Sequence, residues 1–259
     1  MRPQKSEGDC LLQEAQKGLA AFLRLSIALI FASISHMSIA GENPLIEWHS
    51  TDVQLLHGDG FKAGPPERTI ITLQHANRWR YGDNFLFYDK TFDGDDYFEW
   101  HPRLSLSRIS GKSLSIGPIK DVFLAGTLEV PQTGSERYLG GVGLDWNVPS
   151  FNFVKTNFYI RDNPALSGTT WGTTFSWKKK FSIGAQPFLF DGFVDMAGAE
   201  GDRSAYQLAV PALLADIGTH MGYKDRLYLG TEYQYWHNKF GLKGVNESVA
   251  QIELRWIIK

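Results

Sequence analysis

The sequence has 259 residues and a formal net charge of -2, a balance that argues against a nucleic-acid polymer or another strongly charged partner. Aromatic residues make up 14% of the chain and glycines number 26, a composition typical of β-rich folds. The only cysteine is Cys10, so we expect neither a disulfide framework nor thiol chemistry in the rest of the chain.

An apolar segment near the N-terminus predicts export from the cytoplasm. Residues 21–35 are apolar apart from Arg24 and a few serines, and Lys17 adds a second positive charge before them. Ser38-Ile39-Ala40 then matches a small-x-small cleavage site. Together these features predict a cleavable signal peptide.

The predicted cleavage near Ala40–Gly41 divides the chain into a signal peptide over residues 1–40 and a mature domain over residues 41–259. A transmembrane anchor is the alternative, although the apolar run is shorter than the ~20 residues that a helical span needs. The part before residue 17 is long for a signal peptide, which suggests a mis-assigned start codon.

Apolar and polar residues alternate in the mature domain, in segments of about ten residues that are typical of strands. In residues 251–259, Ile252 and Trp256 share one face while Glu253 and Arg255 share the other. We expect twelve such strands, at 47–56, 68–80, 83–90, 97–108, 115–129, 136–148, 151–161, 168–178, 181–197, 204–217, 227–238 and 248–259.

The stretch 104–121 is expected to contribute to two of these strands. Leu104 and Leu106 alternate with serines, a Ser-Gly-Lys turn follows at 110–112, and Leu114 and Ile116 alternate with serines again. Each strand would then have one apolar face and one hydroxyl-bearing face.

The polar faces carry charged residues in mid-strand. In a membrane barrel these faces would line a water-filled lumen, whereas in a soluble β-sandwich, the alternative fold, they would form the outer surface; we favour the barrel. Aromatic residues suited to a membrane interface fall near segment ends or on the apolar face, at Trp146, Trp171, Trp177, Tyr206 and Trp256. We therefore predict an all-β fold, a single antiparallel transmembrane β-barrel with leucines facing lipid.

The connections predict an orientation. If both termini are periplasmic, the outer loops lie at about 57–67, 90–96, 130–135, 162–167, 198–203 and 239–247, and they are expected to be longer than the periplasmic turns. Tight periplasmic turns are expected at 148–150 and 178–180.

The block 99–126 resembles the nucleoside-specific channel-forming outer-membrane proteins of the Tsx/OmpK type. The residues that match that family's pattern are Glu99, Pro102, Arg103, Leu114, Ser115, Gly117, Pro118, Lys120 and Asp121. Residues 48–58 and 188–202 are also similar to the family. The resemblance implies a 12-stranded barrel in the outer membrane of a Gram-negative cell, acting as a passive nucleoside channel.

Alternation also places aromatic and charged residues on the faces that would line the lumen. Aromatic faces can stack on a base, and carboxylates can accept hydrogen bonds from ribose hydroxyls. The predicted substrate-binding residues are Phe85, Phe87, Asp89, Glu99, Arg103, Asp191, Phe193, Asp195 and Glu232. The alternative interpretation is that the charged members form a ladder that only stiffens the wall.

Other functions leave weaker signals. The histidines of the mature domain lack zinc-site spacing, so we expect no metal, and no cofactor is expected either. No His-x-Ser motif of a barrel hydrolase is present, so an enzyme is not expected. A general porin and a phage receptor or adhesin remain alternatives. The expected partners are nucleosides or other small polar solutes and membrane lipid, and we expect a monomer.

Overall fold

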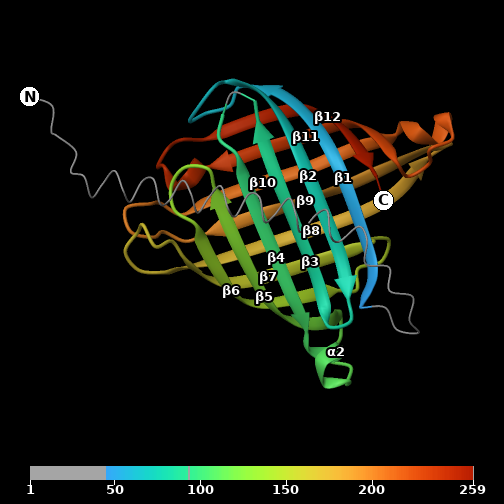
Figure 1. Cartoon of the computed structure of the whole chain (residues 1–259), viewed down its shortest axis with the longest axis horizontal. Coiled ribbons are helices and arrows are strands. Elements are labelled where there is room, and N and C mark those ends of the chain that lie inside the picture. The colour runs from blue at the N-terminus through green and yellow to red at the C-terminus, as the bar shows by residue number, and fades with distance from the viewer. Residues whose placement is uncertain (1–44, 93, 259) are drawn as a thin grey trace, which may run out of the picture. The chain divides into compact units, whose positions relative to one another are not determined.

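The computed structural model describes residues 45–92 and 94–258, and the predicted signal peptide lies outside them. The described chain forms twelve strands that close into one barrel (Figure 1). The strands are β1 (Ile46–Asp59), β2 (Glu67–Trp79), β3 (Gly82–Thr91), β4 (Tyr97–Ser105), β5 (Ile119–Pro131), β6 (Arg137–Trp146), β7 (Phe153–Asp162), β8 (Thr170–Ile183), β9 (Gln186–Ala197), β10 (Tyr206–Asp216), β11 (Leu227–His237) and β12 (Glu247–Ile257).

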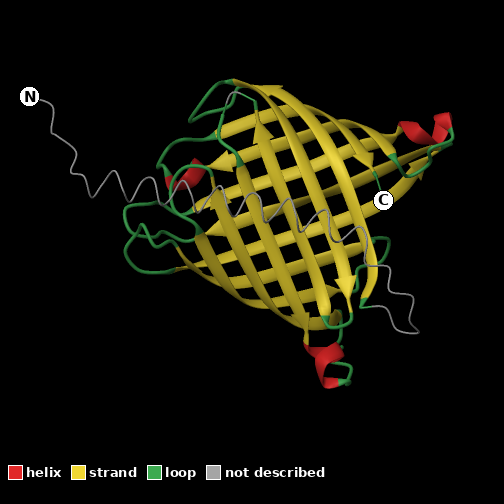
Figure 2. Cartoon of the chain, in the orientation of Figure 1, coloured by secondary structure: helices red, strands yellow, loops and turns green. Residues whose placement is uncertain are grey.

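Each strand pairs antiparallel with the next along the chain, and β1 pairs with β12 to close the sheet. Figure 2 shows the strands crossing one another on the near and far walls, with helices only in the connections. Closure leaves no unpaired sheet edge, which is what a strand-built wall in lipid requires. The predicted fold class is confirmed. Among the described residues, no helix is both long and apolar enough to span a membrane.

The alternation of side chains sets the two faces of the wall. On β12, Gln251 and Glu253 are 1% and 0% exposed, whereas their neighbours Ile252 and Trp256 are 58% and 59% exposed. The polar residues therefore point into the lumen and the apolar residues point outward, as expected for a barrel in lipid.

Two ends of the barrel can be distinguished. The strand β1 begins and the strand β12 ends at one end, here called the terminal end, and the connections after odd-numbered strands lie at the other, the loop end. Two connections at the terminal end are long, over 106–118 and 217–226, and the second contains the 3-10 helix η1 (Ile217–Met221). The predicted rule of short turns at this end is wrong for these two.

The expected hairpin over 104–121 is also wrong. After β4, the helix α2 (Leu106–Ser110) forms because the hydroxyl of Ser105 caps it by accepting from the backbone N–H of Arg108, 3.1 Å away. Gly111, with φ 69°, ends the helix. The strand β5 begins only at Ile119, so the alternation of serines here reflects capping and turn bonds.

Two smaller predictions also differ from the structure. The lysines at 178–180 lie inside β8, and the turn to β9 is made instead at 184–185, where Gly184 has φ 59°. Tyr206 faces the lumen instead of the membrane interface, because it pairs with inward-facing Ala197 and packs against the inward-facing ring of Trp236.

Part of the lumen is filled by apolar side chains. Leu189, Ala212, Leu214 and Tyr228 form a buried cluster on the inner faces of β9, β10 and β11, toward the terminal end. This packing stabilises one side of the barrel and leaves the polar side chains to line the remaining wall.

At the loop end, a buried ion pair joins the last loop to the start of β12, and the first loop donates a hydrogen bond to it. Nζ of Lys239, in the 3-10 helix η2 (Lys239–Gly241), lies 2.6 Å from Oε2 of Glu247. The backbone N–H of Lys62 donates to the same carboxylate at 2.5 Å, and Phe61 beside it is 3% exposed. Burial lowers the pKa of Lys239, and Glu247 opposes that shift by favouring the charged ammonium. We call these four residues the loop latch.

Candidate functional site

All the residues predicted to bind solute lie on inner faces of their strands. The register pairs Phe85, Phe87 and Asp89 on β3 with His101, Glu99 and Tyr97 on β4, and these face the same lumen as the buried side of β12. Asp191, Phe193 and Asp195 line the inner face of β9, and Glu232 lines that of β11. Their direction was predictable because strand alternation has a strict period of two.

Four rings on β3 and β4 form an aromatic cluster, defined by Phe85, Phe87, Tyr97 and His101. The ring centroids of Phe85 and Phe87 are 6.0 Å apart, and that of His101 lies 5.7 Å from Phe85 and 6.4 Å from Phe87. Tyr97 lies 5.9 Å from Phe87. All four rings are partly exposed on the lumen side, so they offer a stacking surface to a flat solute.

Glu99 lies within this aromatic cluster. Nε2 of His101 is 2.7 Å from Oε2 of Glu99, and the hydroxyl of Tyr97 donates to Oε1. Nδ1 of His101 is 3.0 Å from the hydroxyl of Thr127 on β5. Sequence analysis missed Tyr97 and His101 as members of the site, although their positions two residues before and after Glu99 place them on its face.

Phe193 and Asp195 complete the candidate site from β9. The hydroxyl of Thr174 donates to Oδ1 of Asp195 at 2.6 Å, and Asp195 lies on an inner face, toward the same lumen as Glu99. Phe193 is partly exposed on the same face. An aromatic ring and a carboxylate therefore stand on β9 as well as on the wall made by β3 and β4.

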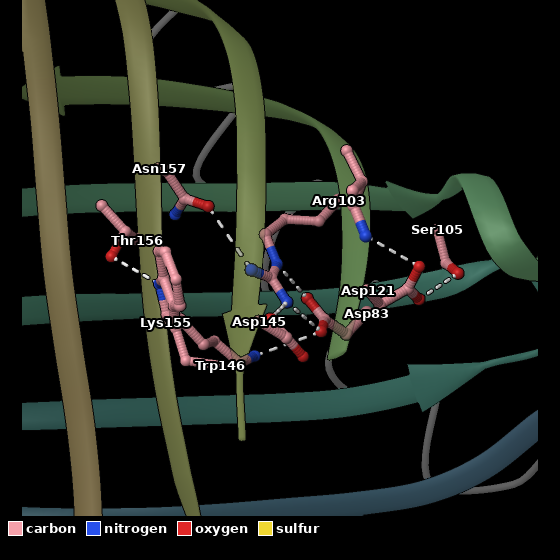
Figure 3. A network of polar contacts seen from close by, with 10 residues as sticks. Asp83, Arg103, Ser105, Asp121, Asp145, Trp146, Lys155, Thr156 and Asn157 are labelled. Carbon is pink, nitrogen blue, oxygen red and sulfur yellow. Dashed lines mark hydrogen bonds and ion pairs between the residues drawn. The ribbon is translucent and has the colours of Figure 1, made fainter. Parts of the chain in front are cut away.

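Arg103 belongs to a different network, shown in Figure 3. Its guanidinium donates to both carboxylate oxygens of Asp83, at 2.9 and 2.8 Å, and to Asp145 at 2.6 Å. Lys155 lies 3.1 Å from Asp83, and the ring of Phe123 lies 4.0 Å from the guanidinium carbon. The side chain of Arg103 is 3% exposed and contacts two carboxylates, which favours the alternative interpretation that it stiffens the wall.

Asp191 is also held by protein groups. Nη1 of Arg255 donates to Oδ2 of Asp191 at 2.7 Å, and Nε of Arg255 donates to Oε1 of Glu253 at 2.6 Å. Glu232 instead accepts a hydrogen bond from the amide of Gln251 at 2.9 Å. The two carboxylates beside Phe193 are therefore not equivalent, because Asp191 faces an arginine and Asp195 only a threonine.

A third ion-pair network lies toward the loop end. Arg161 donates to Glu200 at 2.6 Å and lies 3.5 Å from Glu129, which also lies 3.4 Å from Arg137. Glu200 belongs to the connection after β9, so this network fixes that loop to the wall. Such contacts between distant segments leave no signal in local alternation.

The match to known families decides the identity of the chain. The sequence model of the family described as "Nucleoside-specific channel-forming protein, Tsx" matches residues 88–256. The chain belongs to this family. The matched part includes β4 to β11 and most of β12, and so contains Glu99, Phe193, Asp195 and Glu232.

Two curated relatives are named outer membrane protein OmpK. One, from Vibrio parahaemolyticus, is 24% identical over 164 residues, which cover 61% of this chain and 60% of that protein. The other, from serotype O3:K6 of the same species, is 25% identical over 174 residues, covering 60% and 61%. The matched part thus spans less than two thirds of these relatives. The family and these relatives locate the chain in the outer membrane.

Solved structures with related architecture include the KdgM porin in complex with disordered oligogalacturonate, at a TM-score of 0.48 and 9% identity, covering 80% of this chain and 98% of that one. The outer membrane protein Omp33 of Acinetobacter baumannii gives 0.42 and 11%, covering 82% and 98%. Both TM-scores are too low to support an inference about this chain. The family is one of channels and not of enzymes.

Proposed function

We propose that the protein is a passive outer-membrane channel selective for nucleosides, with both termini periplasmic and the loop end outside. The observation that carries this proposal is the aromatic cluster around Glu99, with Phe193 and Asp195 presented to the same lumen. Family membership supports the substrate class, and the partial exposure of the rings supports access by solute.

The chemistry of these groups suits a nucleoside. A base can stack on the rings of Phe85 or Phe87, since every base has a π-face. Ionised carboxylates only accept hydrogen bonds, so Glu99 and Asp195 can receive them from ribose hydroxyls or exocyclic amines. Two separate pairs of ring and carboxylate give weak, serial sites, which let a solute enter and leave.

The test is a single-channel recording in planar bilayers, with and without added nucleosides. We expect adenosine to reduce the ion current in a saturable way and Phe87→Ala to weaken this block by about tenfold, since one stacked base is worth roughly 1–3 kcal/mol. Phe158→Ala is the matched control, because Phe158 is 52% exposed on the outer face of β7. A current indifferent to nucleosides would indicate a general porin instead.

A further inference from the structure

We propose that four lumen carboxylates make this pore selective for cations over anions. They are Asp89, Glu99, Asp195 and Glu232, here called the acidic belt. The proposal rests on the channel function above, and adds to it a charge selectivity that applies to small ions as well as to larger solutes.

The first argument concerns the cationic side chains of the lumen. Arg103 contacts Asp83 and Asp145, Arg255 contacts Asp191 and Glu253, and Arg161 contacts Glu129 and Glu200. Each of these arginines thus contacts two carboxylates. None of the three has an excess of positive charge to offer to an anion that enters the lumen.

The acidic belt is in the opposite situation. Within the described residues, its members contact hydroxyl, amide or imidazole groups and no arginine or lysine: Thr72 for Asp89, Tyr97 and His101 for Glu99, Thr174 for Asp195, and Gln251 for Glu232. The hydroxyl and amide partners of Asp89, Asp195 and Glu232 carry no positive charge, and only Glu99 has a partner, His101, that can be protonated. These four carboxylates thus lack the direct arginine or lysine contact that balances Asp83, Asp145 and Asp191.

The four carboxylates also face the same lumen. Asp89 and Glu99 lie diagonally opposite on the paired inner faces of β3 and β4, and Asp195 and Glu232 lie on the inner faces of β9 and β11, on either side of β10. These residues come from β3, β4, β9 and β11, so the belt runs across walls of the barrel that are distant along the sheet. Rings of Asp and Glu are a common way to select cations in pores.

A second observation points to a positive or hydrogen-donating group at the belt. Oε1 of Gln251 and Oε2 of Glu253 are buried and have no hydrogen-bond donor among the described residues. Gln251 is bonded to Glu232, and Glu253 is paired in register with Gly230, two residues before Glu232 on β11. Both orphan atoms are acceptors, so a bound cation or donor would satisfy them and an anion would not.

The test is the reversal potential of the purified full-length protein in planar bilayers, under a tenfold KCl gradient. We expect the reversal potential to shift toward the equilibrium potential of K⁺, corresponding to a permeability ratio of K⁺ to Cl⁻ of at least about twofold. Replacing all four residues, by Asp89→Asn, Glu99→Gln, Asp195→Asn and Glu232→Gln, should bring the ratio to about one. If this variant does not fold, Glu99→Gln and Asp195→Asn are compared singly, and each should lower the ratio.

Asp202→Asn is the matched control, because it removes a carboxylate whose side chain is 78% exposed in the connection after β9. A wild-type ratio at or below one, or equal ratios in wild type and belt variants, would overturn the acidic belt. A cation-selective current that nucleosides do not block would support the acidic belt and would contradict only the proposed nucleoside selectivity. Absence of any ion current would overturn the channel function and the belt together.

Discussion

Arg103 on β4 and Asp145 on β6 form a 2.6 Å ion pair although β5 lies between their strands in the sheet. The contact is possible because the residues that share this part of the inner wall are small. Ala125 stands beside Arg103 on β5, and a Cβ built on Gly143 would lie only 3.4 Å from Nη1 of Arg103. The guanidinium therefore ties together strands that do not exchange backbone hydrogen bonds.

We expect Arg103→Met to destabilise the barrel by about 3–5 kcal/mol, because it leaves Asp145 without its cation and Asp83 with Lys155 alone. Urea unfolding in detergent micelles, followed by tryptophan fluorescence, measures the loss. Arg203→Met is the control, since the side chain of Arg203 is 42% exposed and its ion pair with Asp202 is 3.4 Å long. The control should cost at most about 1 kcal/mol, and equal losses would contradict a structural role for Arg103.

Two adjacent glycines on β6 offer a second prediction. A Cβ on Gly141 would lie 1.9 Å from the backbone oxygen of Phe158, whereas a Cβ on Gly140 would meet nothing within 4 Å. Gly141→Ala should therefore cost about 1–3 kcal/mol or more through overpacking, while Gly140→Ala should be near neutral. The fraction of protein that migrates as the compact, heat-modifiable form on unboiled gels distinguishes them. Similar behaviour of the two variants would argue against a close approach of β6 and β7.

The inner and outer faces could be predicted from the sequence because each strand alternates strictly and only one face meets lipid. That logic predicted that Glu99, Phe193 and Glu232 lie on inner faces, and the structure has them there. It failed at 104–121, where Ser105 caps a helix and the serines bond to nearby groups instead of extending the strand. Helix capping and strand alternation use the same residue types, so the local pattern did not separate them.

The partners of the site residues could not be predicted in the same way. Arg103 and Asp191 share the alternation of Glu99 and Asp195, yet the first two contact arginine–carboxylate partners, whereas Glu99 contacts His101 and Asp195 contacts Thr174. The difference depends on which side chains meet across skipped strands and across the lumen. Those contacts follow from the shear and register of the closed sheet, which no single strand records.

A charge on the outer face should be costly. Leu124→Arg places a guanidinium in lipid at the middle of β5, where Leu124 is 51% exposed, and should cost roughly 2–4 kcal/mol. Gln74→Arg, on the inner face at the middle of β2, should be tolerated and should change conductance instead. Ser105 is unsuitable as the inner-face variant, because it is 0% exposed and donates to Asp121. Reversed tolerance in an unfolding assay would indicate that the faces are exchanged.

Phe193→Ala tests the β9 side of the candidate site. Because Asp195 has a neutral partner and Asp191 an arginine, we expect Phe193 to act with Asp195 in holding a solute. The variant should weaken nucleoside block of the current by about tenfold, while unitary conductance stays equal or rises as the lumen widens. Phe158→Ala again serves as the control. Unchanged block in Phe193→Ala would confine solute binding to the aromatic cluster on β3 and β4.

The seam between β1 and β12 has a consequence for biogenesis. Its register runs from Asp52 opposite Ile257 to Gly58 opposite Gln251, and the loop latch continues it with a contact between Lys62 and Glu247, which are 185 positions apart. Closure of the ring must therefore wait for the last strand to be synthesised, and until then β1 presents a bare edge able to recruit other chains. A chaperone or insertion factor that occupies this edge would protect the nascent barrel from aggregation, and it would be released only when β12 replaces it.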